Sequence, residues 1–150
     1  MGGIKLPLMA PAFLCLCLAG LLTACQKTEE SPAQIYLRYH QAEIEGLDFA
    51  RETLFFSAHK QAEVEKSLQA MMQQMQKDRE SVIALTQAFS KSVAKCREIT
   101  LQSEEINGRF AIVVFAQKDI CGSELTGDEK QIIHFVKENG WKIDDIEIQI

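Results

Sequence analysis

The stretch of residues 97–118, REITLQSEEINGRFAIVVFAQK, decides the fold of this chain. At its centre, Asn107-Gly108 is a strong signal for a tight turn between two antiparallel strands. Before the turn, Ile99 and Leu101 alternate with polar residues, as in a strand with one buried face. After the turn, residues 110–116 are all apolar, which predicts a strand in the interior of a sheet.

Two further strands are expected downstream, at residues 132–136 and 141–150. In the last of these, Trp141 and Ile143 occupy odd positions, whereas the isoleucines that follow occupy even positions. These side chains can share one face only if an extra residue interrupts the alternation. We therefore predict a four-stranded antiparallel meander with a bulge at Asp144-Asp145.

Helices are expected before the strands. The sequence Ser31-Pro32-Ala33-Gln34 forms a capping box with proline at the first helical position, so a helix begins there. Gly46 supplies the stop at the end of this helix, and Asp48 can cap a short second helix.

Residues 47–107 contain neither glycine nor proline, and their apolar residues recur at helical spacings of three, four and seven. A single helix over residues 60–93 would be about 50 Å long, more than the width of a domain of this size. We therefore favour two helices that meet near Lys77-Asp78 over one helix with a polar gap. The apolar stripe comprises Val64, Leu68, Met71, Met75, Val82, Leu85, Phe89 and Val93.

The order of elements, helices first and strands afterwards, indicates an α+β fold with N-terminal helices packed on the four-stranded antiparallel meander. The methionines Met71, Met72 and Met75 have two interpretations in this fold. We favour packing in the core over an adaptable binding surface.

The first 24 residues have the composition of an export signal. Lys5 precedes an apolar stretch over residues 6–22, which prolines interrupt and which ends at small residues before a polar run. A membrane-spanning helix needs about 20 consecutive apolar residues, so a permanent transmembrane helix is the weaker interpretation.

The sequence Leu22-Thr23-Ala24-Cys25 resembles the lipobox of bacterial lipoproteins at all four positions. The resemblance implies that residues 1–24 are a lipoprotein signal peptide and that Cys25 is the lipid attachment site, which palmitate and a diacylglyceryl group would modify. Residues 25–30 would then be a tether that reaches roughly 15–20 Å when extended. The alternative is an ordinary secretory peptide cleaved nearby, which leaves Cys25 as a free thiol.

The lipoprotein resemblance also implies a destination. In enterobacterial lipoproteins, an aspartate after the lipidated cysteine retains the protein in the inner membrane. Here Gln26 follows Cys25, so we expect a lipid-anchored protein of the cell envelope, on the outer membrane and facing the periplasm.

The cysteine count fits this interpretation. Of the five cysteines, Cys15 and Cys17 would leave with the signal peptide and Cys25 would carry lipid. The remaining pair, Cys96 and Cys121, is expected to form a structural disulfide in an oxidising compartment. The hairpin would place Cys96 opposite residue 119, close to Cys121. A redox-active pair is the alternative, but the sequence has no Cys-x-x-Cys motif.

The net charge of the domain indicates which kinds of partner it can bind. Loss of Lys5 with the signal changes the formal net charge from −5 to −6. An acidic domain without a basic cluster argues against nucleic acid as a partner, because nucleic acid is bound by lysine and arginine concentrated on one face.

Residues 31–150 are of a length that suits a single α+β domain.

Two short segments resemble small secreted lipoproteins with the nuclear-transport-factor-2-like, or cystatin-like, fold. They are EGLDFA at residues 45–50 and FVKENGWKI at residues 135–143, 15 residues in all. In the family, a Gly-Asp-Phe segment links the first helices, whereas here Leu47 separates Gly46 from Asp48. The resemblance implies a cone-shaped fold, in which helices wrap a concave sheet and often leave a pocket. Ketosteroid isomerases of this fold use a buried aspartate base, and no residue of this chain matches it.

Candidate site residues are few. His134 lies between Ile133 and Phe135 on a strand that could line a pocket, although a partner for general-base chemistry is not identifiable. Trp141 could stack on a ligand, but we favour a role in covering the end of the sheet. Neither His40 nor His59 has a second ligand at metal-binding spacing, so no metal or cofactor is expected.

Three classes of function remain. We favour a non-catalytic envelope domain that binds a protein or a small apolar ligand and reaches the membrane through its N-terminal lipid. The second class is a pilotin-like or assembly accessory factor of an envelope machine. The third is an isomerase-like enzyme with the cone fold, which lacks an evident catalytic set.

Overall fold

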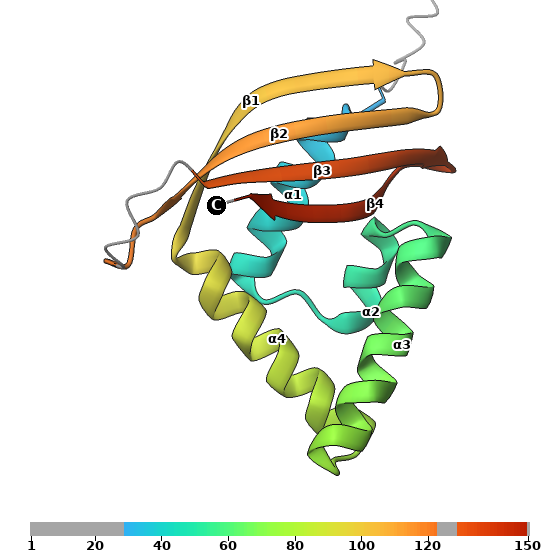
Figure 1. Cartoon of the computed structure of the whole chain (residues 1–150), viewed down its shortest axis with the longest axis vertical. Coiled ribbons are helices and arrows are strands. Elements are labelled where there is room, and N and C mark those ends of the chain that lie inside the picture. The colour runs from blue at the N-terminus through green and yellow to red at the C-terminus, as the bar shows by residue number, and fades with distance from the viewer. Residues whose placement is uncertain (1–28, 123–128, 150) are drawn as a thin grey trace, which may run out of the picture.

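The computed structural model describes residues 29–122 and 129–149. In this part of the chain, helices precede a four-stranded antiparallel sheet of strand order β1-β2-β3-β4 (Figure 1). This arrangement confirms the α+β prediction of helices packed on a meander. None of the helices in the described ranges has the length and apolar character to cross a membrane. The elements are α1 (Pro32–Glu45), α2 (Phe49–Glu52), the 3₁₀ turn η1 (Thr53–Phe55), α3 (Ala58–Met75), α4 (Arg79–Lys95), β1 (Arg97–Asn107), β2 (Phe110–Asp119), β3 (Glu129–Glu138) and β4 (Gly140–Gln149).

The ends of α1 lie where the sequence predicts them. The Ser31 hydroxyl accepts a hydrogen bond from the Gln34 amide at 3.3 Å, and the Gln34 side chain accepts one from the Ser31 amide at 2.9 Å. This reciprocal capping satisfies two amides that the helix itself leaves unpaired. At the other end, Gly46 adopts φ 102°, a conformation that glycine reaches without strain.

The core lies between α1 and one face of the sheet. Tyr36 packs on Phe115 with ring centroids 5.1 Å apart, and Tyr39 packs on Phe56 with centroids 5.6 Å apart. Offset and tilted aromatic contacts of this kind add to the free energy gained from burial. The sheet contributes the fully buried side chains Val113, Phe115, Ile133 and Ile143.

The predicted bulge in β4 is present and has a structural role. His134 pairs with Asp145 and Phe135 with Ile143, so Asp144 is the extra residue. Ser57, which precedes α3, donates its amide to the Ile143 carbonyl at 2.8 Å and its hydroxyl to Asp144 at 2.6 Å. The bulge therefore attaches the start of α3 to the edge of the sheet.

The predicted break between two helices is also confirmed. Helix α3 ends at Met75, Gln76 adopts the left-handed φ of 50°, and the Asp78 carboxylate accepts the Ser81 amide at 2.9 Å to cap α4. Arg79 then contacts Glu65 of α3 through two hydrogen bonds of 2.6 and 2.8 Å, which hold the helices together near the turn.

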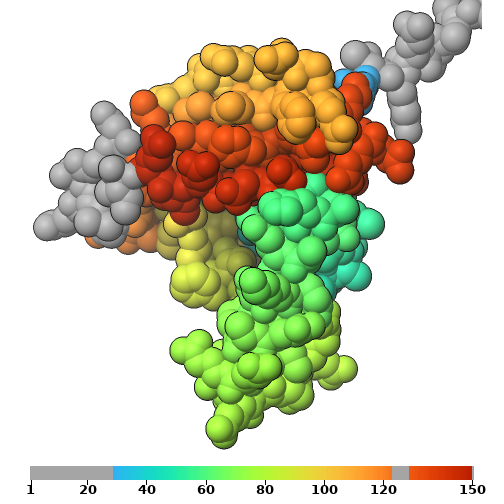
Figure 2. Space-filling view, turned by 45° about the vertical axis from the view of Figure 1, so that its right-hand side comes forward, coloured from blue at the N-terminus to red at the C-terminus, as the bar shows by residue number. Residues whose placement is uncertain are grey.

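The α3/α4 hairpin projects away from the sheet and narrows to a tip at the turn (Figures 1 and 2). Most of the predicted apolar stripe is therefore not in the core, although Leu68 and Val82 are buried. Leu85 is 48% exposed and Phe89 is 71% exposed. Core packing of the methionines is wrong for the same reason: Met71 and Met72 are half-buried, and Met75 is exposed.

The β1–β2 hairpin forms with a turn one residue later than predicted. Asn107 pairs with Phe110, so the two turn residues are Gly108, with φ 60°, and Arg109. A further irregularity between Leu101 and Ser103 shifts the register, which places Arg97 opposite Asp119. The predicted position of Cys96 opposite residue 119 is therefore wrong by one residue.

Strand β2 lies inside the sheet, between β1 and β3, as its apolar composition predicts. Its core face, with Val113 and Phe115, is fully buried. On its other face, Phe110 and Ile112 are exposed to 58% and 42%. The apolar composition of both faces therefore correctly predicted that β2 lies inside the sheet. It did not mean that both faces of the strand are buried.

The predicted disulfide joins Cys96 to Cys121, whose Cα atoms are 5.1 Å apart. Cys96 lies between α4 and β1, and its carbonyl accepts a hydrogen bond from the Ile120 amide at 2.9 Å. The bridge therefore links the end of the helical hairpin to the end of β2.

Replacement of both Cys96 and Cys121 by serine is expected to lower the free energy of unfolding by about 3 kcal/mol, because the bridge closes a loop over 25 residues. Denaturant titration of the wild type and the double variant measures this difference. Added reductant should destabilise the wild type and leave the variant unchanged. Peptide mapping of the unreduced protein should find the two cysteines joined, and free thiols at both positions would contradict the bridge.

Candidate functional site

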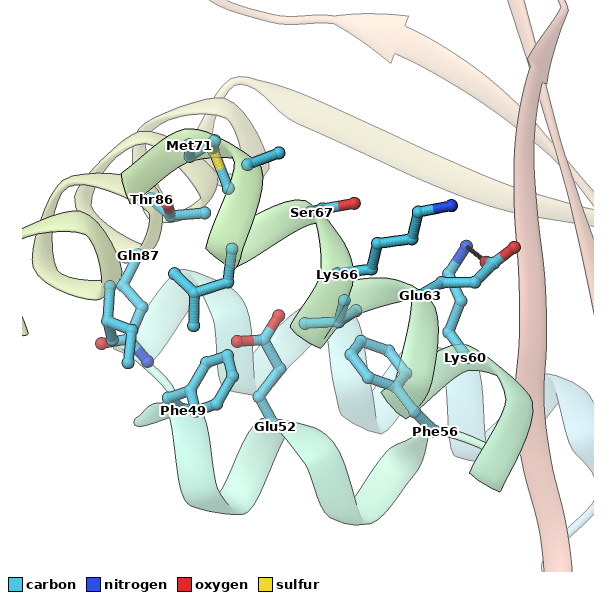
Figure 3. A pocket seen from close by; sticks show the side chains of 14 residues that line it. Phe49, Glu52, Phe56, Lys60, Glu63, Lys66, Ser67, Met71, Thr86 and Gln87 are labelled. Atoms are coloured by element: carbon cyan, nitrogen blue, oxygen red, sulfur yellow. Dashed lines mark hydrogen bonds and ion pairs between the residues drawn. The ribbon is translucent and has the colours of Figure 1, made fainter. Parts of the chain in front are cut away.

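A cavity of about 630 Å³ lies between α2, α3 and α4 and is called here the hairpin cavity (Figure 3). It forms because α3 and α4 diverge from their shared tip, with α2 and the 3₁₀ turn between them (Figure 1). Its apolar wall comprises Phe49, Phe56, Val64, Leu68, Ala70, Met71 and Ile83. A cavity of this size and character suits a small, largely apolar molecule.

Charged groups lie at definite places in the hairpin cavity. The Glu52 carboxylate points inward between the rings of Phe49 and Phe56 (Figure 3). At the end near the sheet, Lys60 contacts Glu63 at 3.2 Å and Asp145 of β4 at 2.7 Å. This cation therefore already has two anionic partners. Burial alone would lower the pKa of Lys60, but the two carboxylates outweigh that effect and raise it.

Glu52 belongs to a small buried network centred on Tyr39 of α1. The Tyr39 hydroxyl lies 3.0 Å from Glu43, one turn later in the same helix, and 3.5 Å from Glu52. Burial raises the pKa of Tyr39 well above its ordinary value, so the phenol keeps its proton. The hydroxyl has one proton to donate, and the shorter distance assigns it to Glu43.

The two carboxylates titrate abnormally because of where they lie. Burial raises the pKa of Glu43 to about 7; the charge on Glu52 raises it further, whereas the Tyr39 hydrogen bond and Arg97 oppose the shift. Burial likewise raises the pKa of Glu52. Neither carboxylate takes part in an ion pair among the described residues. A carboxyl group with a pKa near 7 can exchange a proton under physiological conditions.

Glu43 and Glu52 lie where several hollows meet. Both line a small hollow with Gln87 and Lys91 of α4. Glu52 continues into the hairpin cavity, whereas Glu43 also lines a second cavity of about 290 Å³ with His40 and Phe89. The two carboxylates therefore border different cavities, with Glu52 on the hairpin cavity and Glu43 on the second one.

The two candidate pocket residues from the sequence, His134 and Trp141, are not brought together. His134 contacts Glu147 at 3.0 Å and lines a cavity of about 470 Å³ with Asp145. Trp141 is 7% exposed in the core, and the Lys137 ammonium lies 5.3 Å from its ring centroid. It borders a different cavity, of about 260 Å³, with Arg38 and Phe55.

The remaining sequence candidates are placed as follows. Cys25, the predicted lipid attachment site, lies outside the described residues. Cys96 and Cys121 form the disulfide. Residues 29–122 and 129–149 hold no group of three histidine, cysteine, aspartate or glutamate side chains that could bind a metal ion.

Sequence reasoning missed the residues that form the site, Tyr39, Glu43 and Glu52. One signal was available, because Glu43 follows Tyr39 by four residues and so lies close to the buried face of the first helix. Glu52 carried a weaker signal as a lone acid among the phenylalanines of residues 49–56. The spacing of the acidic residues along the sequence does not show which of them lie close together in the fold.

Glu43→Gln is expected to flatten the dependence of stability on pH. The folded pKa of about 7 exceeds the ordinary value of 4.5, so this group stabilises the fold at low pH and loses that contribution as pH rises to 7. Between pH 5 and pH 8, the wild type should lose roughly 2 kcal/mol more unfolding free energy than the variant. Urea titrations at both pH values measure the difference.

Tyr39→Phe provides the opposite change. Removal of its hydrogen bond raises the pKa of Glu43 further, so the loss of stability with pH should become steeper. Equal pH dependence in the wild type and both variants would show that Glu43 titrates normally.

Comparison of the chain with protein-family models, with curated proteins and with solved structures found no match. The resemblance to nuclear-transport-factor-2-like lipoproteins therefore stays a prediction from short motifs.

Proposed function

We propose that this chain is a lipid-anchored envelope lipoprotein whose domain binds a small, largely apolar ligand without transforming it. The observation that carries the proposal is the hairpin cavity of about 630 Å³, with its mostly apolar wall. Few apolar side chains of α3 and α4 are buried in the core. The apolar surface of these two helices is therefore available to a ligand.

The anchor part of the proposal rests on Leu22-Thr23-Ala24-Cys25 and on the residues before it. Cleavage before Cys25 and acylation of its thiol would place the domain on the outer membrane, facing the periplasm. The disulfide between Cys96 and Cys121 supports an oxidising compartment of this kind.

Binding is favoured over catalysis because of how the acids are placed. Glu43 and Glu52 both contact the Tyr39 hydroxyl, so they lie together, and of the two only Glu52 lines the hairpin cavity. Proton abstraction by one carboxylate also needs a group that stabilises the charge formed on the substrate, and Lys60, which could do this in the hairpin cavity, is already paired with Glu63 and Asp145. The pair is better suited to hold charge at one end of a ligand.

A second candidate function, an accessory role in an envelope machine, is favoured by one observation. Met75, Leu85 and Phe89 of the α3/α4 hairpin are all more than 40% exposed. Exposed apolar side chains on a projecting element are typical of protein-binding surfaces. Cross-linking from Phe89 in whole cells would distinguish this role, because a ligand-binding protein should give no specific adduct there.

Cys25→Ser is expected to abolish both palmitate labelling and retention in the membrane fraction. The serine hydroxyl cannot replace the thiol that accepts the lipid, so the protein should remain unlabelled. Cys17→Ser serves as the matched control, because this cysteine would leave with the signal peptide, and it should be labelled like the wild type. Labelling that persists in Cys25→Ser would refute the lipid anchor.

Ligand binding can be tested on the full chain in phosphatidylcholine nanodiscs by ¹³C-methyl NMR of methionine. Met71 lines the hairpin cavity, whereas Met75 is exposed near its tip and does not, so the two methyl groups report on occupied and unoccupied surfaces. Octanol should shift the Met71 signal in a saturable way and leave the Met75 signal in place. Ala70→Trp, at the cavity wall, should block the shift, and Ala62→Trp, elsewhere on α3, should not.

A further inference from the structure

Two carboxylates line the hairpin cavity, and only one of them has a cationic partner among the described residues. Glu63 pairs with Lys60 at 3.2 Å. Within the described ranges, the Glu52 carboxylate has one hydrogen-bond partner, the Tyr39 hydroxyl at 3.5 Å, and that hydroxyl lies closer to Glu43. The negative charge of Glu52 is therefore left largely uncompensated in a half-buried place.

The surroundings of Glu52 suit a positive charge. Phe49 and Phe56 lie on either side of its carboxylate (Figure 3). Aromatic rings attract cations through their electron-rich faces, and a carboxylate adds direct charge attraction. Phe49 already makes one such contact, because the Arg79 guanidinium lies 5.6 Å from its ring centroid.

The lysines of the cavity do not occupy this place. Lys60 is held by Asp145 at 2.7 Å and by Glu63. The Lys66 ammonium extends away from Glu52 toward the outside of α3 (Figure 3).

Two further cations lie nearby, but Lys91 donates to the Glu45 carbonyl at 2.9 Å and Arg79 pairs with Glu65 at 2.6 Å. Among the described residues, no cation therefore pairs with Glu52.

We propose that the hairpin cavity binds a small amphipathic cation, an amine with an apolar chain. Its ammonium group lies at Glu52 between Phe49 and Phe56, and its chain extends along Leu68 and Met71 toward the tip of the hairpin. This inference rests on the binding function proposed above and names the class of its ligand. It requires no covalent step and no cofactor.

The test compares three probes of equal chain length, octylammonium, octanol and octanoate, on the full chain in phosphatidylcholine nanodiscs at pH 8. The shift of the Met71 methyl signal gives the dissociation constant, referred to the free probe concentration measured by dialysis. Octylammonium is expected to bind at least tenfold more tightly than octanol, and octanoate more weakly than octanol.

Glu52→Gln should reduce the preference for octylammonium over octanol to less than threefold, because it removes the charge and keeps the shape. Glu80→Gln is the matched control, since it removes an exposed carboxylate of α4 that does not line the hairpin cavity; it should keep the tenfold preference. Phe49→Leu is a second variant for the case that Glu52→Gln does not fold, and it should weaken octylammonium binding at least threefold.

The outcomes separate the two proposals. Equal binding of octanol and octylammonium would overturn the cation inference and leave the binding function in place. Tighter binding of octanoate would overturn the inference in favour of an anionic ligand held by Lys66. If none of the probes shifts the Met71 signal, the binding function itself fails.

Discussion

The hydroxyl of Tyr39 is the group on which the arrangement of the first helices depends. The tyrosine ring is buried against Phe55 and Phe56, at centroid distances of 5.4 and 5.6 Å. A hydroxyl carried into the core must find a hydrogen-bond partner there, because an unsatisfied polar group is costly. Glu43 supplies that partner from α1, and Glu52 approaches from α2. The apolar packing of one aromatic ring thus brings two carboxylates into a half-buried place.

The second constraint is where the helical hairpin is attached. Helix α3 begins at β4 through Ser57 and the Asp144 bulge, and α4 leads through Cys96 into β1. These strands are the two edges of the sheet, so the helices start far apart and meet only at the turn (Figure 1). The hairpin cannot lie flat on the sheet, and the space between its helices becomes the cavity.

Local signals in the sequence predicted the features that depend on local chemistry. The capping box at Ser31, the cap at Asp48 and the change of alternation near Asp144 each concern a few neighbouring residues, and all are present. The register of the first hairpin was missed because the turn residues are Gly108 and Arg109 instead of Asn107 and Gly108, and the irregularity after Leu101 corrects only part of that shift. Burial of α3 and α4 was overestimated because periodicity shows which face is apolar, not whether that face meets a core.

The site is less predictable than the fold for a related reason. Glu43 and Glu52 lie on different helices, and the chain has many acids that are simply solvated. The two carboxylates lie close together because the Tyr39 ring of α1 packs against the 3₁₀ turn, which is a tertiary contact. A sequence can mark Glu43 as an acid close to an apolar face, but it does not say which second acid lies near it.

The free-energy cost of ionising Glu43 gives the clearest indication of what the two glutamates, Glu43 and Glu52, do. A rise in the pKa of Glu43 from 4.5 to about 7 means that ionisation at high pH costs the fold about 3 kcal/mol, similar to what the disulfide contributes. Small domains have only about 5–15 kcal/mol of stability in total. Glutamine at position 43 or 52 would accept a hydrogen bond from Tyr39 without this cost. What the two glutamates supply beyond a hydrogen bond is negative charge, and a ligand that carries a positive charge would restore the stability that their ionisation removes.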